Sequence, residues 1–402
     1  MKDKVQSINF ISILIYLCCY FLQLFRFPDI LMLGIGAVFC LLLLIKQKQI
    51  RINLGLCLLA GTMFPFCMIQ FGTSAVFARM IYVVLLIWVL ADYLGADLKE
   101  TKHGETKLIY VVYSLILGHL IYSILNSYMY FAGTGVPGTR YWFDIWSQQL
   151  TPGTQLTMYF ISIFAVFFPA VIYFSRRKWA NAIIIIGTCF LVYVSLATRT
   201  RTTLLVLAIV FFVQVILCVL LEKENVLSKI SSKKIWTSVA VIVVLMLLGI
   251  FLVKDTQIVK EFIDNLGKGG GILNNIRFTT QRKALSQLFG YPMGGRKMDL
   301  GLIYCHNVWL DMANASGLIP FFAFTGFTVY TLYNLIHFSM QKDIHTETKL
   351  IMVGMYAAFF LYYTVEPALD SSVHFITPWI LINGLIHGYM LKEGRKNEIR
   401  KI

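Results

Sequence analysis

The residues best suited to chemistry in this sequence are one histidine and a pair of arginines. His306 lies where a polar stretch gives way to an apolar one, and neutral imidazole readily takes up a proton near pH 7. Arg199 and Arg201 lie together in a short turn between two apolar runs. The planar guanidinium fork matches phosphate and carboxylate groups, so these arginines favour an anionic ligand. Such a set could remove a proton from one substrate while stabilising charge on another.

Two further arginines, Arg277 and Arg282, lie upstream of His306 in residues 276–289. A Gly-rich connector, residues 267–271, precedes this stretch, and residues 291–295 (Tyr-Pro-Met-Gly-Gly) end it. Its apolar positions recur at roughly helical spacing, at Ile276, Leu285, Leu288 and Phe289. We predict that these residues form an amphipathic helix lying on a membrane surface.

Asn307 and Asp311 follow His306 closely enough to cap the next helix or to orient the imidazole. Simpler interpretations stay open, because an interfacial histidine can cap a helix and a single arginine can snorkel to lipid headgroups. The paired arginines, Arg199 and Arg201, argue for a ligand, since an uncompensated arginine costs about 2.5–3.5 kcal/mol at the middle of a bilayer. Arg140 and Arg296 are further candidates for support.

The composition favours a membrane as the environment of this chain. Of 402 residues, 58% are hydrophobic and only 14% are charged, whereas soluble domains are roughly a quarter charged. The formal charge of +15 arises from short basic clusters between apolar runs, which are typical of topology signals and argue against nucleic acid as a partner. All eight cysteines lie in or beside apolar runs. No pair has metal-ligand spacing, so we interpret them as small hydrophobic residues. No cluster of metal ligands stands out on the expected outer face, and we expect no metal and no other cofactor.

Twelve apolar runs have the composition of membrane-crossing helices. They cover residues 8–26, 30–45, 52–70, 76–95, 108–131, 155–175, 180–198, 202–221, 235–253, 305–338, 349–366 and 373–391. Gly317 and Pro320 should divide the run at 305–338 into a short helix (306–315) and a true span (318–338). We predict an all-α polytopic membrane protein with a single membrane domain over residues 1–402. Residues 254–304 should form one large extracytoplasmic loop between transmembrane helices 9 and 10.

The distribution of lysine and arginine predicts the orientation. If the N-terminus is cytoplasmic, 22 of the 35 basic residues fall in inner segments and only five in short outer loops, as the positive-inside rule expects. The inner segments hold 17 Lys and five Arg, whereas all five in the short outer loops are Arg. Both termini are therefore expected in the cytoplasm, with His306 and the arginines named above on the outer face.

Three motifs, taken together, resemble the O-antigen ligase and polymerase superfamily, which includes capsule and exopolysaccharide repeat-unit polymerases. The first is a Ser/Thr-x-Ser/Thr-Arg turn that opens a helix, here residues 198–205. The second is an arginine-bearing loop helix that closes on Pro-x-Gly, here residues 277–294. The third is His-Asn-x-x-Leu before a Gly-Leu-Ile helix start, here residues 306–319. The chain departs from the family pattern at Thr202, where a Gly is usual, and at Ser316, where an acidic residue is usual.

The resemblance implies a GT-C-like, metal-independent glycosyltransferase of the cytoplasmic membrane. It would transfer an oligosaccharide from a polyprenyl (undecaprenyl) diphosphate onto an acceptor sugar at the outer face. His306 would be the base. The diphosphate would be bound by Arg199, Arg201, Arg277 and Arg282. Asn307, Asp311, Arg140 and Arg296 would support them. The expected partners are the lipid-linked oligosaccharide, membrane lipids, and flippase and chain-length regulator proteins.

Two alternatives stay open. A ligase would use the same donor with a different acceptor, and the Lys-, Phe- and Tyr-rich composition favours a capsule polymerase over it. A flippase for the same lipid would also need basic residues, but along a central path and usually within an internal repeat. The basic residues here gather at one face and no repeat is evident, which favours the enzyme over a transporter or a scaffold.

Overall fold

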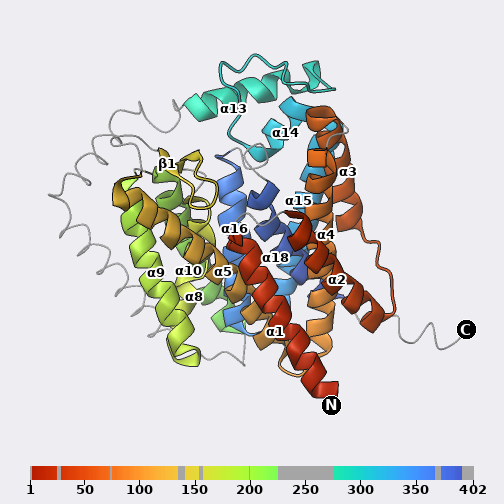
Figure 1. Ribbon diagram of the computed structural model, residues 1–402, viewed down its shortest axis with the longest axis vertical. Helices are drawn as coiled ribbons and strands as arrows, with labels where there is room; N and C mark the ends of the chain where they lie inside the picture. Colours follow the sequence, from red (N-terminus) through yellow and green to blue (C-terminus); the bar gives the residue numbers. More distant parts are fainter. Residues whose placement is uncertain are drawn as a thin grey trace, which may run out of the picture.

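The computed structural model describes residues 2–24, 29–72, 75–134, 141–153, 157–198, 200–224, 276–366 and 373–391. In these residues the chain is an almost entirely helical bundle (Figure 1). The longer helices are α1 (Lys2–Phe21), α2 (Asp29–Gln47), α3 (Leu54–Phe71), α4 (Ala75–Glu100), α5 (Gly104–Met129), α9 (Lys178–Ala197), α10 (Arg201–Glu224), α15 (Leu318–Met340) and α16 (Thr346–Tyr363). The shorter helices are α7 (Phe160–Phe164), α8 (Phe167–Ile172), α13 (Ile276–Gln287), α14 (Val308–Ser316) and α18 (Thr377–Met390). A small antiparallel hairpin joins β1 (Tyr141–Phe143) to β2 (Leu150–Pro152).

Several of these helices have the length and apolar composition of membrane-spanning helices. Within the described residues, six are long and apolar enough to cross one, judged by length and composition: Ile30–Gln47, Arg79–Glu100, Gly104–Ala132, Lys178–Ala197, Thr202–Leu221 and Leu318–Met340. Large apolar side chains such as Leu41 on α2 and Phe212 and Ile216 on α10 lie exposed on the outside of the bundle. Such a surface is costly in water and suitable against lipid. The chain is an all-α protein with the character of a membrane-embedded one.

The helices coincide with the predicted apolar runs wherever the structure describes them. The run at 235–253 and residues 254–275 of the predicted loop lie outside the described residues, so twelve crossings and a large loop stay predictions. The predicted break in the run at 305–338 is confirmed, because α14 ends at Ser316 and α15 begins at Leu318.

The predicted span at 155–175 differs from a continuous helix, since α7 and α8 are separated at residues 165–166. Pro169 has no N–H to donate to the carbonyl of Ala165, which is the partner it would have in a helix. The Nε2 of Gln214, on α10, donates instead to that carbonyl (2.6 Å) and to the carbonyl of Leu350 (2.9 Å). One buried amide therefore stabilises the interruption, as non-helical backbone in a membrane requires.

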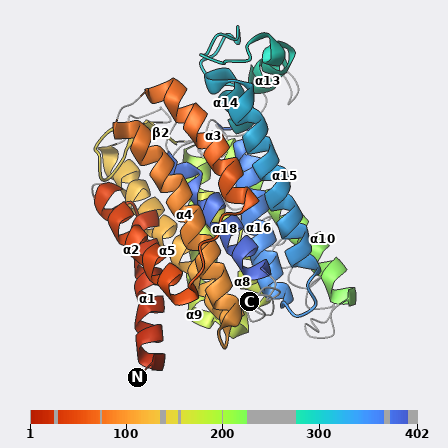
Figure 2. The same cartoon turned by 90° about the vertical axis from the view of Figure 1, so that its right-hand side faces the viewer.

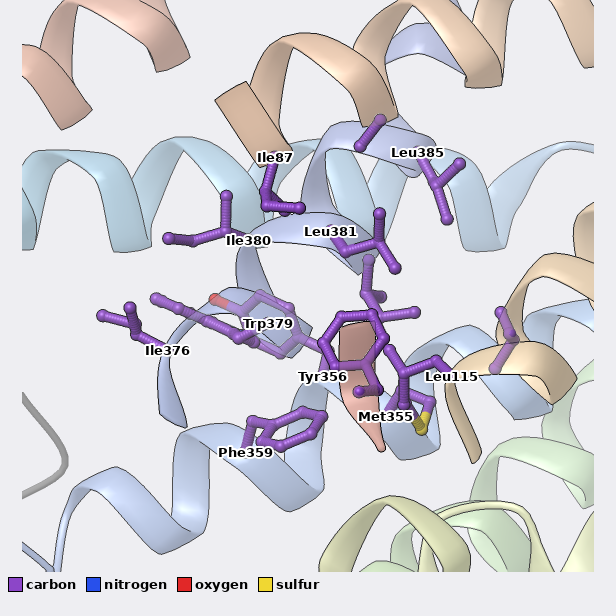
Figure 3. Packing of buried hydrophobic residues seen from close by; sticks show 14 of the residues in the cluster. Ile87, Leu115, Met355, Tyr356, Phe359, Ile376, Trp379, Ile380, Leu381 and Leu385 are labelled. Carbon is purple, nitrogen blue, oxygen red and sulfur yellow. The ribbon is translucent and has the colours of Figure 1, made fainter. Parts of the chain in front are cut away.

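The centre of the bundle is formed by α18, which lies between α4 and α16 (Figure 2) and is buried from Thr377 to Gly388. Gly388 lies so close to α4 that a Cβ there would come within 2.0 Å of the Asp92 carbonyl oxygen. Toward α16, the ring of Trp379 packs against Tyr356, with 5.6 Å between the ring centroids (Figure 3). This packing fixes α16, whose C-terminal end carries part of the site described below.

The N-terminal end of α16 is fixed by charge. The buried carboxylate of Glu347 pairs with Arg176 (2.9 Å) and with Arg177, both in the segment that connects α8 and α9. At the start of the same helix, Glu105 accepts from the backbone N–H of His345 (2.8 Å). Because buried carboxylates are stable only when paired, these contacts hold α16 in register with α5 and α9.

At the other end of α16 the bundle is capped by α13 and α14 (Figures 1 and 2). The loop after α13 runs beside the junction of α14 and α15 and pairs with its backbone. Leu318 donates to the Pro292 carbonyl (2.9 Å), Gly295 to Ala315 (2.9 Å) and Arg296 to Asn314 (2.7 Å). Two motifs that are distant in the sequence, Pro-x-Gly and Gly-Leu-Ile, therefore form one tether that places α13 over the bundle.

We expect Gly317→Ala to break this tether. Gly317 has φ +89°, and an added Cβ would come within 2.2 Å of the Pro292 carbonyl oxygen. The left-handed backbone alone costs a residue with a side chain about 1–3 kcal/mol. Thermal unfolding of the purified protein in detergent should show a lower midpoint. Gly290→Ala is the control, since a Cβ there meets no atom within 4 Å. Equal midpoints for the two variants would contradict the tether.

Candidate functional site

Four segments that are distant in the sequence bring polar side chains together at the capped end of the bundle. Glu366 follows α16, Arg277 lies in the first turn of α13, Thr202 in the first turn of α10, and His306 just before α14. The Glu366 carboxylate is the centre of the group: its Oε1 accepts from Arg277 Nη1 (2.8 Å) and lies 3.4 Å from Thr202 Oγ1, and its Oε2 lies 3.8 Å from His306 Nδ1.

Arg277 is anchored by three acceptors on one nitrogen. Besides Glu366, its Nη1 donates to the Val365 carbonyl (3.0 Å) and to Thr202 Oγ1 (3.3 Å). The side chain of Glu366 is 5% exposed and that of Arg277 is 25% exposed. A buried carboxylate thus holds a guanidinium that solvent or a ligand can still reach, which is an arrangement suited to binding an anion.

His306 is held in an unusual backbone conformation by the residues on either side of it. Its φ is 55°, in the left-handed region that residues with a side chain seldom adopt. The carboxylate of Asp311 accepts from the N–H of Cys305 and from the N–H of Asn307 (3.1 Å), the two residues that flank His306. The two interactions stabilise the strained turn. Asn307 caps α14, because its Oδ1 accepts from the Leu310 N–H (3.1 Å).

Two amides connect this turn to its neighbours. The Nε2 of Gln281 on α13 donates to the carbonyls of His306 (3.1 Å) and Thr364 (2.9 Å). The Nδ2 of Asn307 lies 3.4 Å from the Thr364 carbonyl. Because Thr364 is two residues from Glu366, the backbones that carry His306 and Glu366 are held together. The side chain of His306 is 25% exposed, so the imidazole remains accessible.

The loop helix differs from the predicted amphipathic pattern. The face of α13 that packs on the protein is formed by Arg277, Thr280, Gln281 and Ala284, at true helical spacing, and the buried Leu288 follows just after the helix ends. Ile276, Leu285 and Phe289 are exposed, and the first lies on a different side of the helix from the other two. Small and polar side chains orient the helix because its inner face contacts backbone carbonyls and charged groups.

Of the predicted arginines, Arg277 is the one placed at His306 and Glu366. Arg282 lies five positions further along α13, about 140° around the helix, and is exposed. Arg296 belongs to another contact: its Nε donates to Gln70 Oε1 (3.2 Å) and its guanidinium lies over the Tyr304 ring (5.5 Å). Arg201 is the first residue of α10, next to Thr202. Arg199 and Arg140 lie outside the described residues.

Glu366 is the central residue that the sequence did not predict as part of the site. Its signal was an acidic residue at the end of an apolar run, in Thr364-Val365-Glu366-Pro367. In a run predicted to span a membrane, a carboxylate at the edge is expensive, and it therefore indicates a functional site. Its partners Thr202 and Arg277 are 164 and 89 positions away, so no local pattern connects them.

The chemistry available here is acid–base and electrostatic. An accessible imidazole can take up a proton, and an accessible guanidinium can stabilise an anion beside it. No group of three or more His, Cys, Asp or Glu side chains in the described part of the chain could hold a metal ion. No protein-family model and no curated protein matches the sequence.

Proposed function

We propose that this chain is a membrane-embedded polysaccharide polymerase. It transfers an oligosaccharide from polyprenyl diphosphate onto an acceptor sugar at the outer face of the cytoplasmic membrane. The observation that supports this proposal is the group of His306, Arg277 and Glu366, in which an accessible base lies beside an anchored, accessible arginine.

In the reaction, His306 removes the proton from the acceptor hydroxyl as its oxygen attacks the anomeric carbon of the donor sugar. The bond from that carbon to the diphosphate oxygen breaks, and polyprenyl diphosphate leaves with the electron pair. Arg277, Arg201 and Arg199 stabilise the charge that develops on it. By analogy with oxyanion donors, one such contact lowers the rate-determining barrier by about 3–4 kcal/mol.

The proposed orientation follows from the basic residues and the position of the site. Arg176 and Arg177 contact the N-terminal end of α16, whereas Glu366 follows its C-terminal end. The first end is the one predicted to be cytoplasmic. The site would then face outward, where a lipid-linked sugar that has been flipped across the membrane is available, with twelve crossings and both termini inside.

Cysteine labelling tests this orientation. In a chain whose native cysteines are replaced, Ser286→Cys on α13 should react in intact cells with a reagent that cannot cross the membrane. Lys342→Cys, exposed between α15 and α16, should react only after permeabilisation. The reverse pattern would place His306 and Arg277 on the cytoplasmic face and contradict the proposed function.

The activity itself is tested with purified protein, a lipid-linked repeat unit and EDTA. A polymerase gives a ladder of products spaced by one repeat unit, and EDTA should leave the ladder unchanged. A ligase would join a single chain to a different acceptor and give no ladder. A flippase would move the lipid across vesicle membranes without making a glycosidic bond. Either of the last two results would replace the polymerase with the corresponding alternative.

A further inference from the structure

The carboxylate of Glu366 faces both functional groups of the site, but it satisfies only one of them. Its Oε1 is 2.8 Å from Arg277 Nη1, which is a full charge-assisted hydrogen bond. Its Oε2 is 3.8 Å from His306 Nδ1, which is too far for one. That Nδ1 is buried and has no hydrogen-bond partner among the residues that the structure describes. The structure therefore shows an arginine that is paired and an imidazole that is not.

A histidine base works well only when its ring is oriented and its tautomer is fixed. A carboxylate that accepts from Nδ1–H leaves Nε2 as the free base and stabilises the cation that forms when the base takes up a proton. Among the described residues, Glu366 is the carboxylate that lies within 4 Å of Nδ1, and an approach of about 1 Å would bring the pair into hydrogen-bond range. The backbone of His306 is already held by Asp311 and Gln281, so the carboxylate is the group that has to move.

A diphosphate would cause that movement. It presents the same geometry to a guanidinium fork as a carboxylate does, and it carries more negative charge. Once a diphosphate binds Arg277, it competes with Glu366 for the guanidinium and repels the Glu366 carboxylate. His306 Nδ1 is the other donor that this carboxylate already faces.

We propose that binding of the lipid diphosphate transfers Glu366 from Arg277 to His306, so that the base is oriented only when the donor is in place. This inference rests on the proposed diphosphate site. It makes Glu366 a positioning residue that acts through His306. Its consequence is an order of events: the acceptor hydroxyl is activated only after the donor binds.

The proposal predicts opposite effects of one substitution, Glu366→Gln, on diphosphate affinity and on the rate of polymer synthesis. Glu366→Gln removes the competing charge, so the protein should bind farnesyl diphosphate, a short polyprenyl diphosphate, roughly tenfold more tightly than the unmodified chain. The same variant should make polymer at least about tenfold more slowly, because His306 lacks its acceptor. A residue that only supported the position of Arg277 would show the opposite effect on binding, since its loss would weaken the diphosphate site.

The transfer can be observed by NMR on protein labelled with ¹⁵N in its histidine rings, with the His306 signals identified by their absence in His306→Gln. On saturation with farnesyl diphosphate, Nδ1 should become the protonated ring nitrogen and Nε2 the unprotonated one. Glu366→Gln should bind the probe without this change, and Arg277→Gln should show the Nδ1-protonated state with no probe present. Glu366→Asp keeps the carboxylate and should respond as the unmodified chain does, which excludes a folding defect as the cause.

The results separate two kinds of failure. If farnesyl diphosphate binds and the His306 signals do not change, or change equally in Glu366→Gln, the transfer of Glu366 is wrong and the proposed function stands. Weaker binding of the probe by Glu366→Gln would likewise overturn it. If the unmodified protein does not bind the probe at saturating concentration, the diphosphate site is wrong and both proposals fall.

Discussion

Replacing His306 by alanine should slow polymer synthesis by about 10²–10⁴-fold, the usual contribution of a positioned general base. The imidazole is exposed enough to reach a substrate, while its backbone is held by Asp311 and Gln281, so the fold should survive the change. The variant should remain in the membrane and still bind the lipid diphosphate. The measurement is the rate of ladder formation by purified protein at saturating donor.

His374→Ala provides the comparison. His374 is the other histidine expected near the outer face, and its ring lies beside Tyr20, with 5.7 Å between the ring centroids. We expect a milder effect there. A near-normal ladder from His306→Ala would remove this residue as the base and leave a reaction driven by the arginines alone. Loss of donor binding in the same variant would instead show that His306 shapes the site.

The second large effect is expected from Arg277→Lys. The substitution keeps the positive charge but loses the planar fork, in which Nη1 contacts Glu366, Val365 and Thr202 while the rest of the guanidinium can receive an anion. The loss of one preorganised hydrogen-bond donor that stabilises a developing anion typically lowers the turnover rate about 10²–10³-fold, and we expect a reduction of that order here.

Arg282→Lys is a matched control on the same helix. Its side chain is exposed and points away from Glu366, so the change should leave the rate within about twofold of the unmodified protein. The rates of both variants are compared at equal amounts of folded protein. If Arg277→Lys is as active as Arg282→Lys, the fork is not needed and Arg277 serves as an anchor for α13 alone.

The helices could be predicted from the sequence because a long apolar run is recognisable without knowledge of its neighbours. Each predicted run that the structure describes lies on a helix, and the break at Gly317 was visible from glycine and proline alone. The interruption between α7 and α8 was missed, although Pro169 marks it. A continuous helix and a broken one have the same hydropathy. The break here is stabilised by a buried amide, that of Gln214, which lies far away in the sequence.

The sequence singled out two of the residues that the structure brings together, His306 and Arg277, but not Glu366. His306 stood out because it lies at a boundary between polar and apolar sequence. Arg277 and Arg282 looked equivalent, because the register of α13 against the bundle is set by contacts with Thr364 and His306. Glu366 is central only because α10, α13 and α16 meet, and that meeting depends on packing between segments that are distant in the sequence.

The most direct test of the proposed reaction is to count polyprenyl diphosphate released against glycosidic bonds formed, in one vessel with purified protein and a lipid-linked repeat unit. We expect one polyprenyl diphosphate for each repeat unit joined, and neither product from His306→Ala on the same timescale. Lipid movement across vesicles with no diphosphate released, or release with no chain growth, would contradict glycosyl transfer as the function of this site.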